Sequence, residues 1–145
     1  MIRLATLEDK EEIFRMAVAF YQQASYNFPV DQEYGYEYIL RHLANSECLS
    51  LILEVDNQPS GVLLGFATNH PFSPVRVANE IVWWVDPPAR GKASLDLLDA
   101  FEYWALHKQN CKYICLTSSG DIRLDRLYRR SGYEPKEHSW VKEFS

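Results

Sequence analysis

The sequence contains few cysteines and no closely spaced pair of them. Cys48, Cys111 and Cys115 form an odd set without a CxxC motif, which is poor material for a disulfide framework or a zinc site. The four histidines are scattered, and none has a partner at the spacing of metal ligands. We therefore expect the cysteines to be packing residues and expect no bound metal.

The sequence also lacks a long apolar run. No segment approaches the roughly 18 apolar residues that a membrane-spanning helix needs. The N-terminus turns acidic after Thr6 and has none of the apolar core of a signal peptide. These absences predict a soluble, cytoplasmic protein that does not bind membranes.

Positive charge is not in excess. Lys and Arg number 15 against 20 Asp and Glu, giving a net charge of −5, which argues against broad binding to nucleic-acid phosphates but allows a small anionic ligand held locally. The composition, 47% hydrophobic and 14% aromatic, is the reverse of that of a disordered chain. The length of 145 residues fits a single domain over residues 1–145, because domains usually contain about 100 to 200 residues.

Residue periodicity predicts a mixed α/β chain with helices packed on a sheet. We expect a turn over 56–61, a strand over 112–117 that is buried on both faces, and a closing strand over 133–143. Helical spacing extends from Ile13 to Ala24, begins again near Asp31, and recurs from Gly91 to about His107 and around Leu124 to Tyr128. The other predicted strands are 2–5, 48–55, 62–68 and 79–85.

The most informative stretch is the junction of a strand and a helix at residues 85–94. Free backbone amides at a helix N-terminus, together with the helix dipole, form a ready site for phosphate. Gly91 and Ala93 would allow a pyrophosphate to approach the backbone closely, and Arg90 and Lys92 add positive charge there. On its own this is a moderate signal, because Arg-Gly-Lys before a helix is also ordinary loop chemistry.

This stretch resembles the signature of the GNAT superfamily of N-acetyltransferases, which is Gln or Arg, two residues, Gly, one residue, and Gly or Ala. Here it reads Pro88-Ala89-Arg90-Gly91-Lys92-Ala93, with Pro88 in place of the usual first polar residue. Residues 124–133 are similar to a second landmark of the family, a helix with a Tyr followed by Gly and an aromatic residue. With the order of the elements, the resemblance covers essentially the whole chain.

The resemblance implies a central mixed sheet with helices on both faces, in which the parallel strands 80–85 and 112–117 separate to admit acetyl-coenzyme A (acetyl-CoA). The pantetheine arm would pair with backbone near the end of the first strand, and the pyrophosphate would rest on the amides of residues 90–94. Ser118 and Ser119 stand where the family often has an Asn that contacts the coenzyme, although they also fit a plain turn with Gly120. The expected coenzyme-binding residues are Trp84, Val85, Arg90, Gly91, Lys92, Ala93, Ser94 and Ser119.

Two side chains are candidates for proton transfer. Glu80 resembles the general base that some family members carry at the start of this strand, but a single Glu there could also be a solvated acid at the strand end. Tyr128 matches the family's Tyr that donates a proton to the coenzyme thiolate, although it shares a helical stripe with Leu124 and Leu127 and could be a core residue. By analogy, the amide of Val85 would polarise the acetyl carbonyl.

The acceptor site is expected between the loop joining the first two helices and the loop at 70–74. Tyrosines and acidic residues crowd the first region, which suits a cationic amine, but a helix pair with an acidic solvated face and an aromatic core explains them equally well. The residues concerned are Tyr21, Tyr26, Tyr34, Tyr36, Tyr38, Asp31, Glu33 and Glu37.

We therefore predict an N-acetyltransferase that moves acetyl from acetyl-CoA directly to a primary amine of a small molecule or a protein. Many family members form homodimers, so a homodimer is one expectation for the oligomeric state. One alternative is a catalytically inactive module that binds coenzyme or a protein partner, suggested by Pro88 and by Ser94-Leu95-Asp96, where the family commonly has a second Gly. Another is an interaction domain that presents exposed Trp83, Trp84 and Tyr26.

Overall fold

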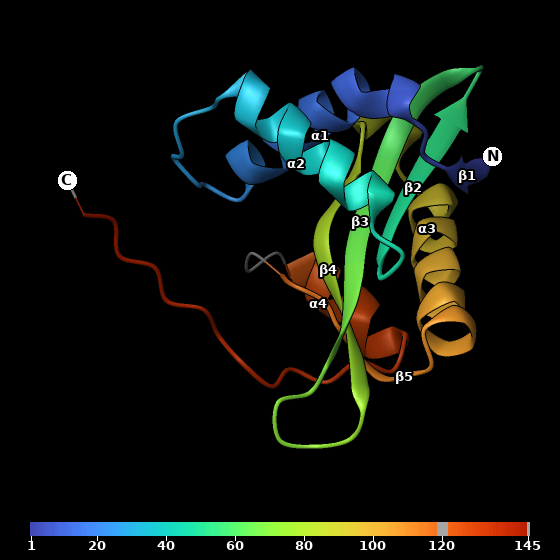
Figure 1. The fold of residues 1–145 in the computed structure, drawn as a ribbon, viewed down its shortest axis with the longest axis vertical. Helices are drawn as coiled ribbons and strands as arrows, with labels where there is room; N and C mark the ends of the chain where they lie inside the picture. The colour runs from blue at the N-terminus through green and yellow to red at the C-terminus, as the bar shows by residue number, and fades with distance from the viewer. Residues whose placement is uncertain (119–121, 145) are drawn as a thin grey trace.

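The computed structural model describes residues 1–118 and 122–144 (Figure 1). Five strands form one sheet in the order β1-β2-β3-β4-β5. Neighbouring strands are antiparallel, except that β5 runs parallel to β4. The strands are β1 (Ile2–Leu4), β2 (Cys48–Val55), β3 (Gln58–Asn69), β4 (Arg76–Val85) and β5 (Cys111–Cys115).

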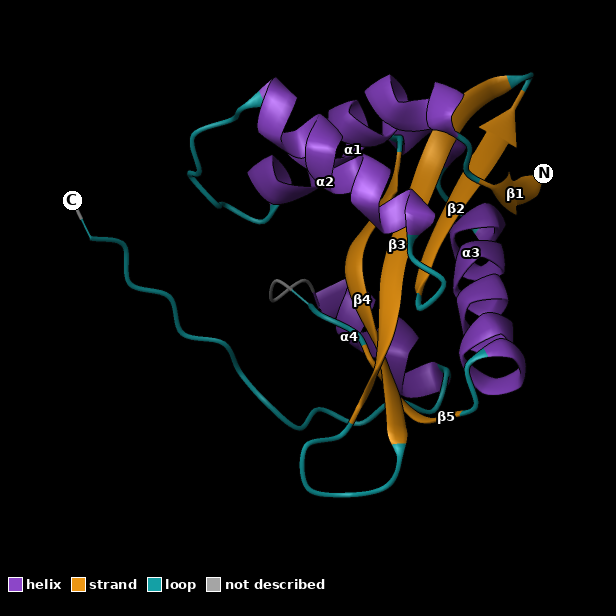
Figure 2. Ribbon diagram, viewed as in Figure 1, coloured by secondary structure: helices purple, strands orange, loops and turns teal. Residues whose placement is uncertain are grey.

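Helices cover both faces of this sheet, as predicted (Figure 2). On one face lie α1 (Lys10–Gln23) and α2 (Gln32–Ala44). On the other lies α3 (Lys92–Tyr103), which continues into a π turn at Trp104–Lys108, and α4 (Ile122–Arg130) follows β5. None of these described helices is both long enough and apolar enough to span a membrane.

The strand alternation places two cores on opposite faces of the sheet. In β3, Val62 and Leu64 contact the α1 and α2 side, whereas Leu63 and Ala67 contact the α3 side. Ile13 and Met16 of the predicted α1 stripe are fully buried, as are Leu97 and Phe101 of α3. The periodicities of α1 and α3 therefore identified the buried faces of these two helices correctly.

The hairpin between β2 and β3 is tighter than the predicted turn over 56–61. Asp56 and Asn57 alone make the turn, with φ angles of 52° and 63°, and Val55 already pairs with Gln58. Asp and Asn tolerate this left-handed conformation better than most residues. Pro59 lies within the predicted turn, but in β3 it pairs with Glu54 next to a bulge, one of the positions in a sheet where proline fits.

The strand predicted over 112–117 forms as β5, but its expected burial was wrong, and so was the closing strand. β5 ends at Cys115 and is an edge strand among the described residues, so Tyr113 is 60% exposed and not buried on both faces. No strand forms over 134–144, which run away from the body of the protein (Figure 1). Pro135 lacks an N–H for a ladder, and the Lys-Glu-His-Ser stretch that follows it offers no apolar face to bury.

A close contact between β3 and α3 yields a stability prediction. A Cβ added at Gly65 would lie 2.6 Å from Cε1 of Phe101, whose side chain is fully buried. We expect Gly65→Ala to destabilise the protein by about 1–3 kcal/mol, the usual effect of overpacking a core. Urea unfolding measures the change, with Thr68→Ala on the exposed end of β3 as control; equal stability of Gly65→Ala and the parent would contradict the packing described.

Candidate active site

The parallel strands β4 and β5 pair for only part of the length of β4. Pairing begins at Arg76 with Cys111 and ends at Asn79 with Cys115. Beyond that point β4 continues to Val85, and among the described residues no strand pairs with residues 80–85 on the β5 side. The two strands thus part where the resemblance predicted an opening, although β5 is shorter than the expected 112–117.

A bulge in β4 lies at the start of this opening. Leu64 pairs with Val82 and Gly65 pairs with Glu80, so Ile81 is an extra residue in the ladder. Bulges redirect side chains and increase the local twist of a strand. The bulge therefore adjoins Glu80 at the position where β4 leaves β5.

Thr117 connects the two candidate side chains across the opening. Its hydroxyl donates to Oε2 of Glu80 at 2.9 Å, and its carbonyl accepts from the Tyr128 hydroxyl at 2.7 Å. Tyr128 is buried in α4, and its ring stacks on Trp83 with the centroids 6.2 Å apart. Glu80 and Tyr128, which are distant in sequence, are thus brought to one residue just past the end of β5.

Burial governs the proton affinities of both groups. It raises the pKa of Glu80 to about 7, against the opposing effect of the hydrogen bond from Thr117. It also raises the pKa of the Tyr128 phenol, and the negative charge of Glu80 adds to this rise. Glu80 is half-buried and is the fifth residue of β4, so it neither opens the strand nor is a solvated strand-end acid.

The N-terminus of α3 lies next to the end of β4. Gly91 is its N-cap with φ of 136°, a conformation that favours glycine, and a Cβ there would meet no atom within 4 Å. The N–H groups of Gly91, Lys92 and Ala93 have no backbone acceptor within the described parts of the chain. Free amides at the positive end of a helix dipole are the usual arrangement for binding an anion, and we call these three solvent-facing amides the cradle.

The predicted span of phosphate-binding amides, 90–94, is too wide. The N–H of Arg90 donates to the carbonyl of Pro87 at 3.3 Å, and the N–H of Ser94 donates to the carbonyl of Gly91 at 3.0 Å. The N–H of Arg90 closes the 3₁₀ turn that precedes the cradle, and the N–H of Ser94 closes the first turn of α3. Neither amide is therefore free.

The side chains around the cradle have distinct positions. Nε of Arg90 donates to the carbonyl of Val85 at 2.8 Å, and the Arg90 guanidinium lies 4.7 Å from the Trp84 ring centre. The Lys92 side chain is 87% exposed and 3.4 Å from Asp96. Positive charge is therefore present at the cradle, as predicted.

The aromatic residues that were candidates for an exposed partner surface are mostly engaged. Trp83 is half-buried against Tyr128, and Trp84 is half-buried and donates from Nε1 to Asp86 at 2.9 Å. Their expected exposure was therefore wrong, since both rings pack within the site. Tyr26 is 37% exposed and stacks on Phe28.

The tyrosines expected around the acceptor do not form one group. Tyr21 contacts Tyr26 in the loop between α1 and α2, and its pKa is raised by burial with smaller contributions from the charges of Tyr38 and Glu80. Tyr36 packs edge-on against Phe14, and Tyr34 is 70% exposed.

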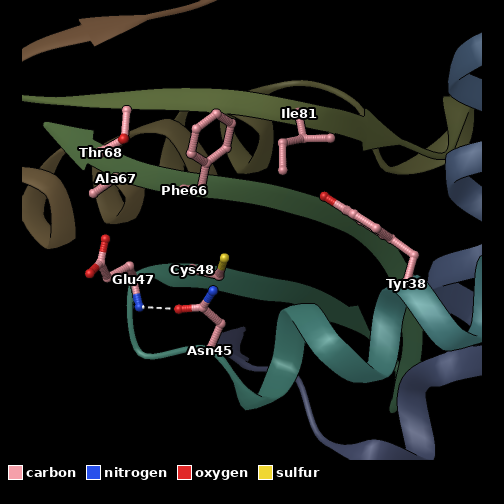
Figure 3. A pocket seen from close by; sticks show the side chains of 8 residues that line it. All are labelled: Tyr38, Asn45, Glu47, Cys48, Phe66, Ala67, Thr68 and Ile81. Atoms are coloured by element: carbon pink, nitrogen blue, oxygen red, sulfur yellow. Dashed lines mark hydrogen bonds between the residues drawn. The ribbon is translucent and has the colours of Figure 1, made fainter. Parts of the chain in front are cut away.

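Tyr38 belongs to a cavity of about 270 Å³ on the α2 side of the sheet (Figure 3). In the close view its hydroxyl points towards the side chains of Phe66 and Ile81, which come from β3 and β4. Ile81, one of the residues that line the cavity, is the bulge residue that follows Glu80 in β4. The lining residues of the cavity are Tyr38, Asn45, Glu47, Cys48, Phe66, Ala67, Thr68 and Ile81.

Of the serines after β5, Ser119 lies outside the described residues, and Ser118 donates to Oδ1 of Asp125 at 2.6 Å. Sequence reasoning overlooked Thr117, because it was read as the last residue of a strand. Its position immediately before the two serines was the only available signal.

The chain matches the family model of the GNAT acetyltransferases over residues 10–133. It belongs to that family. GNAT enzymes use acetyl-CoA as the acetyl donor, so the predicted enzyme class and co-substrate are confirmed at the level of the family. No curated protein sequence matches the chain.

Solved structures of GNAT-type proteins share the fold at low sequence identity. A predicted acetyltransferase with acetyl-CoA from Clostridium acetobutylicum has a TM-score of 0.80 and 17% identity, covering 99% of this chain and 95% of that one. An aminoglycoside 6′-N-acetyltransferase from Acinetobacter haemolyticus has a TM-score of 0.77 and 15% identity, covering 100% and 98%. A ribosomal-protein-alanine N-acetyltransferase from Brucella melitensis has a TM-score of 0.72 and 21% identity, covering 99% of each chain.

The geometry of the cradle predicts an effect on coenzyme affinity. Valine at Gly91 would strain a backbone at φ of 136° and place a branched side chain beside the free amides. We expect Gly91→Val to weaken acetyl-CoA binding at least about tenfold, measured by calorimetric titration.

Gly132→Val is the matched control. Gly132 also has a positive φ, 89°, and open space around it, but it lies after α4 and not at the cradle. Equal losses of coenzyme affinity in the two variants would assign the effect to general backbone strain and contradict the proposed cradle.

Proposed function

We propose that this GNAT domain, comprising residues 1–145, transfers acetyl from acetyl-CoA directly to the nitrogen of a primary amine. The observation that carries the proposal is the meeting of Glu80 and Tyr128 at Thr117, beside the opening between β4 and β5. The test is release of free coenzyme thiol in the presence of amines. An absence of turnover despite coenzyme binding would favour the inactive-module alternative.

Glu80 takes the part of general base. A primary amine is protonated at neutral pH and cannot attack a carbonyl until it loses a proton. A carboxylate with a pKa of about 7 is ionised in a large fraction of molecules at neutral pH and is still basic enough to accept that proton. The freed amine then attacks the thioester carbonyl, forming the C–N bond.

Tyr128 takes the part of general acid. When the C–S bond breaks, the coenzyme leaves as a thiolate, which needs a proton. Because burial raises the pKa of Tyr128, the phenol is fully protonated at neutral pH and can donate its proton to the sulfur. The phenolate then recovers a proton from the positively charged nitrogen of the tetrahedral adduct, which becomes the amide. Glu80 releases the proton that it accepted from the ammonium group to solvent, so both residues return to their starting states.

The coenzyme is positioned by the end of β4 and the start of α3. The free amides of Gly91, Lys92 and Ala93 would bind the pyrophosphate, and the side chains of Arg90 and Lys92 would add to its attraction. The pantetheine arm would lie along β4 in the opening, near Trp84 and Val85, with the Val85 amide polarising the acetyl carbonyl. Ser94 would support the cradle through its bond to Gly91 and not through a free amide.

The acceptor would approach from the side of α1 and α2. Tyr21 lies within electrostatic reach of Glu80, and the cavity of Tyr38 and Phe66 is also lined by Ile81, the residue that follows Glu80 in β4. Aromatic rings beside a carboxylate suit a cationic amine on an apolar body. We propose a small-molecule or protein amine as the acceptor.

The three cysteines are free, which suits a reducing compartment. We therefore propose that the enzyme works in the cytoplasm.

Removing the Tyr128 hydroxyl tests the general acid. We expect Tyr128→Phe to lower kcat about 100-fold or more, the usual contribution of a positioned acid, with the acetyl-CoA Kd changed less than about twofold. Tyr133→Phe is the control, because its hydroxyl bonds to Glu102 at 3.2 Å and not to Thr117. Equal turnover in Tyr128→Phe and the parent would rule out this role.

The pH dependence tests the general base. We expect kcat/KM of the parent to rise with pH and level off above about 7, where Glu80 is ionised. In Glu80→Gln this limb should disappear and the profile shift to higher pH, following the amine itself. Glu102→Gln is the control, because the pKa of Glu102 is also raised by burial but this residue contacts Tyr133.

The same group gives a stability signature. Because the pKa of Glu80 is higher in the folded state than its ordinary value of 4.5, folding stability should fall as pH rises from about 4.5 to 7. Glu80→Gln should lack this part of the decline. If the parent and Glu80→Gln had identical pH profiles of both activity and stability, both the general-base role and the raised pKa of Glu80 would be contradicted.

A further inference from the structure

Asp86 fixes the segment that leads from β4 to the cradle. It immediately follows Val85, and its N–H donates to the carbonyl of Ser60 at 2.8 Å. Its carbonyl accepts from the N–H of Ala89 at 2.8 Å. The backbone of Asp86 is therefore tied on one side to β3 and on the other to the 3₁₀ turn that precedes Gly91.

The carboxylate of Asp86 is held by two more partners. Arg15 donates to it with a fork, Nη1 to Oδ1 at 3.1 Å and Nη2 to Oδ2 at 2.9 Å. The indole N–H of Trp84 donates to Oδ1 at 2.9 Å. The hydrogen bonds from Arg15 lower the pKa of Asp86, so the carboxylate is ionised at neutral pH.

The contacts continue from Asp86 to Arg90. Trp84, oriented by its bond to Asp86, lies under the Arg90 guanidinium at 4.7 Å, and Arg90 donates from Nε to Val85. Among the described residues only Nε of Arg90 makes a hydrogen bond, and the positive charge of Arg90 adds to the lowering of the Asp86 pKa. Arg15, Asp86, Trp84 and Arg90 thus form one chain of contacts, which we name the Arg15 clamp.

Arg15 lies on α1 and does not touch the cradle. It precedes Asp86 by 71 residues and also pairs with Glu12 at 2.6 Å on its own helix. We propose that Arg15 is a positioning residue for the coenzyme, which holds Asp86 so that the amides of residues 91–93 and the Arg90 side chain are aligned with the pyrophosphate. This inference rests on the proposed function, since it requires acetyl-CoA to bind at the cradle.

A purely structural role predicts something different. The Arg15 side chain is 46% exposed and that of Asp86 is 25% exposed, and exposed ion pairs add little to global stability. A positioning role predicts a small change in stability and a large change in coenzyme affinity. Two properties of the same variants therefore separate the two explanations.

The experiment measures acetyl-CoA binding by calorimetry for Arg15→Ala, Arg15→Lys, Asp86→Asn and the Arg15→Ala/Asp86→Asn double variant. We expect Arg15→Ala to raise the Kd about tenfold, the size of a lost charge-assisted fork. The Kd of the double variant should be no higher than that of the weaker-binding single variant, because each substitution removes the same Arg15–Asp86 interaction. Lysine should rescue only in part, since it cannot form the fork.

Glu12→Gln is the matched control. It removes the other partner of Arg15 and leaves the clamp intact, so its Kd should match that of the parent. A Kd in Glu12→Gln as high as that in Arg15→Ala would overturn the proposal.

A shortened donor gives a second readout. S-acetylpantetheine lacks the pyrophosphate, so Arg15→Ala should lower kcat/KM with this donor much less than kcat/KM with acetyl-CoA. Unchanged acetyl-CoA affinity, or parallel losses with both donors, would overturn the clamp. Failure of the proposed function is distinct, because the parent itself would then bind no acetyl-CoA or acetylate no amine.

Discussion

The parting of β4 from β5 after the Asn79–Cys115 pair is the constraint on which the site depends. While two parallel strands are paired, their backbone groups satisfy each other, and no ligand can enter between them. After the pairing ends, β4 keeps its contact with β3 on one side and is open on the other. The fold thus presents strand backbone to a ligand without unfolding any strand.

Where the backbone hydrogen bonds between β4 and β5 end, side-chain contacts connect the two sides of the opening. Thr117 reaches Glu80 across it, and Tyr128 of α4 closes one end through the Thr117 carbonyl and the Trp83 ring. Burial in this part of the fold raises the pKa of both Glu80 and Tyr128, while the hydrogen bond from Thr117 lowers that of Glu80. The same feature, the partial burial of polar side chains where β4 and β5 part, therefore underlies both the contacts at the opening and the raised pKa values of Glu80 and Tyr128.

Charge is distributed to suit an anionic coenzyme in an acidic protein. The chain carries a net charge of −5, yet the start of α3 combines free amides, the helix dipole, Arg90 and Lys92. A local positive site in a negative field selects small anions that reach the cradle and disfavours polyanions that would contact the whole surface. The net charge of the chain argued against broad nucleic-acid binding, but it could not show where a small anion would bind.

Local sequence features predicted what depends on local physics. The stripes of α1 and α3, the start of the second helix near Asp31 and the helix start at Gly91 all follow from neighbouring residues. The closing strand was wrong because an apolar pair such as Trp140-Val141 does not reveal whether an edge is available to it, and Trp140 is 93% exposed. Thr117 and Arg15 were missed because their partners lie 37 and 71 residues away, a separation that no periodicity encodes.

The central claim is that acetyl-CoA binds in the opening with its pyrophosphate on the first amides of α3. Titration of isotopically labelled protein with acetyl-CoA, followed by amide chemical shifts in NMR, tests it at each residue. The account predicts the largest shifts at Gly91, Lys92 and Ala93 and along residues 80–85 of β4. Saturating acetyl-CoA that leaves these amides unmoved, or that shifts mainly α2 and β2, would contradict it.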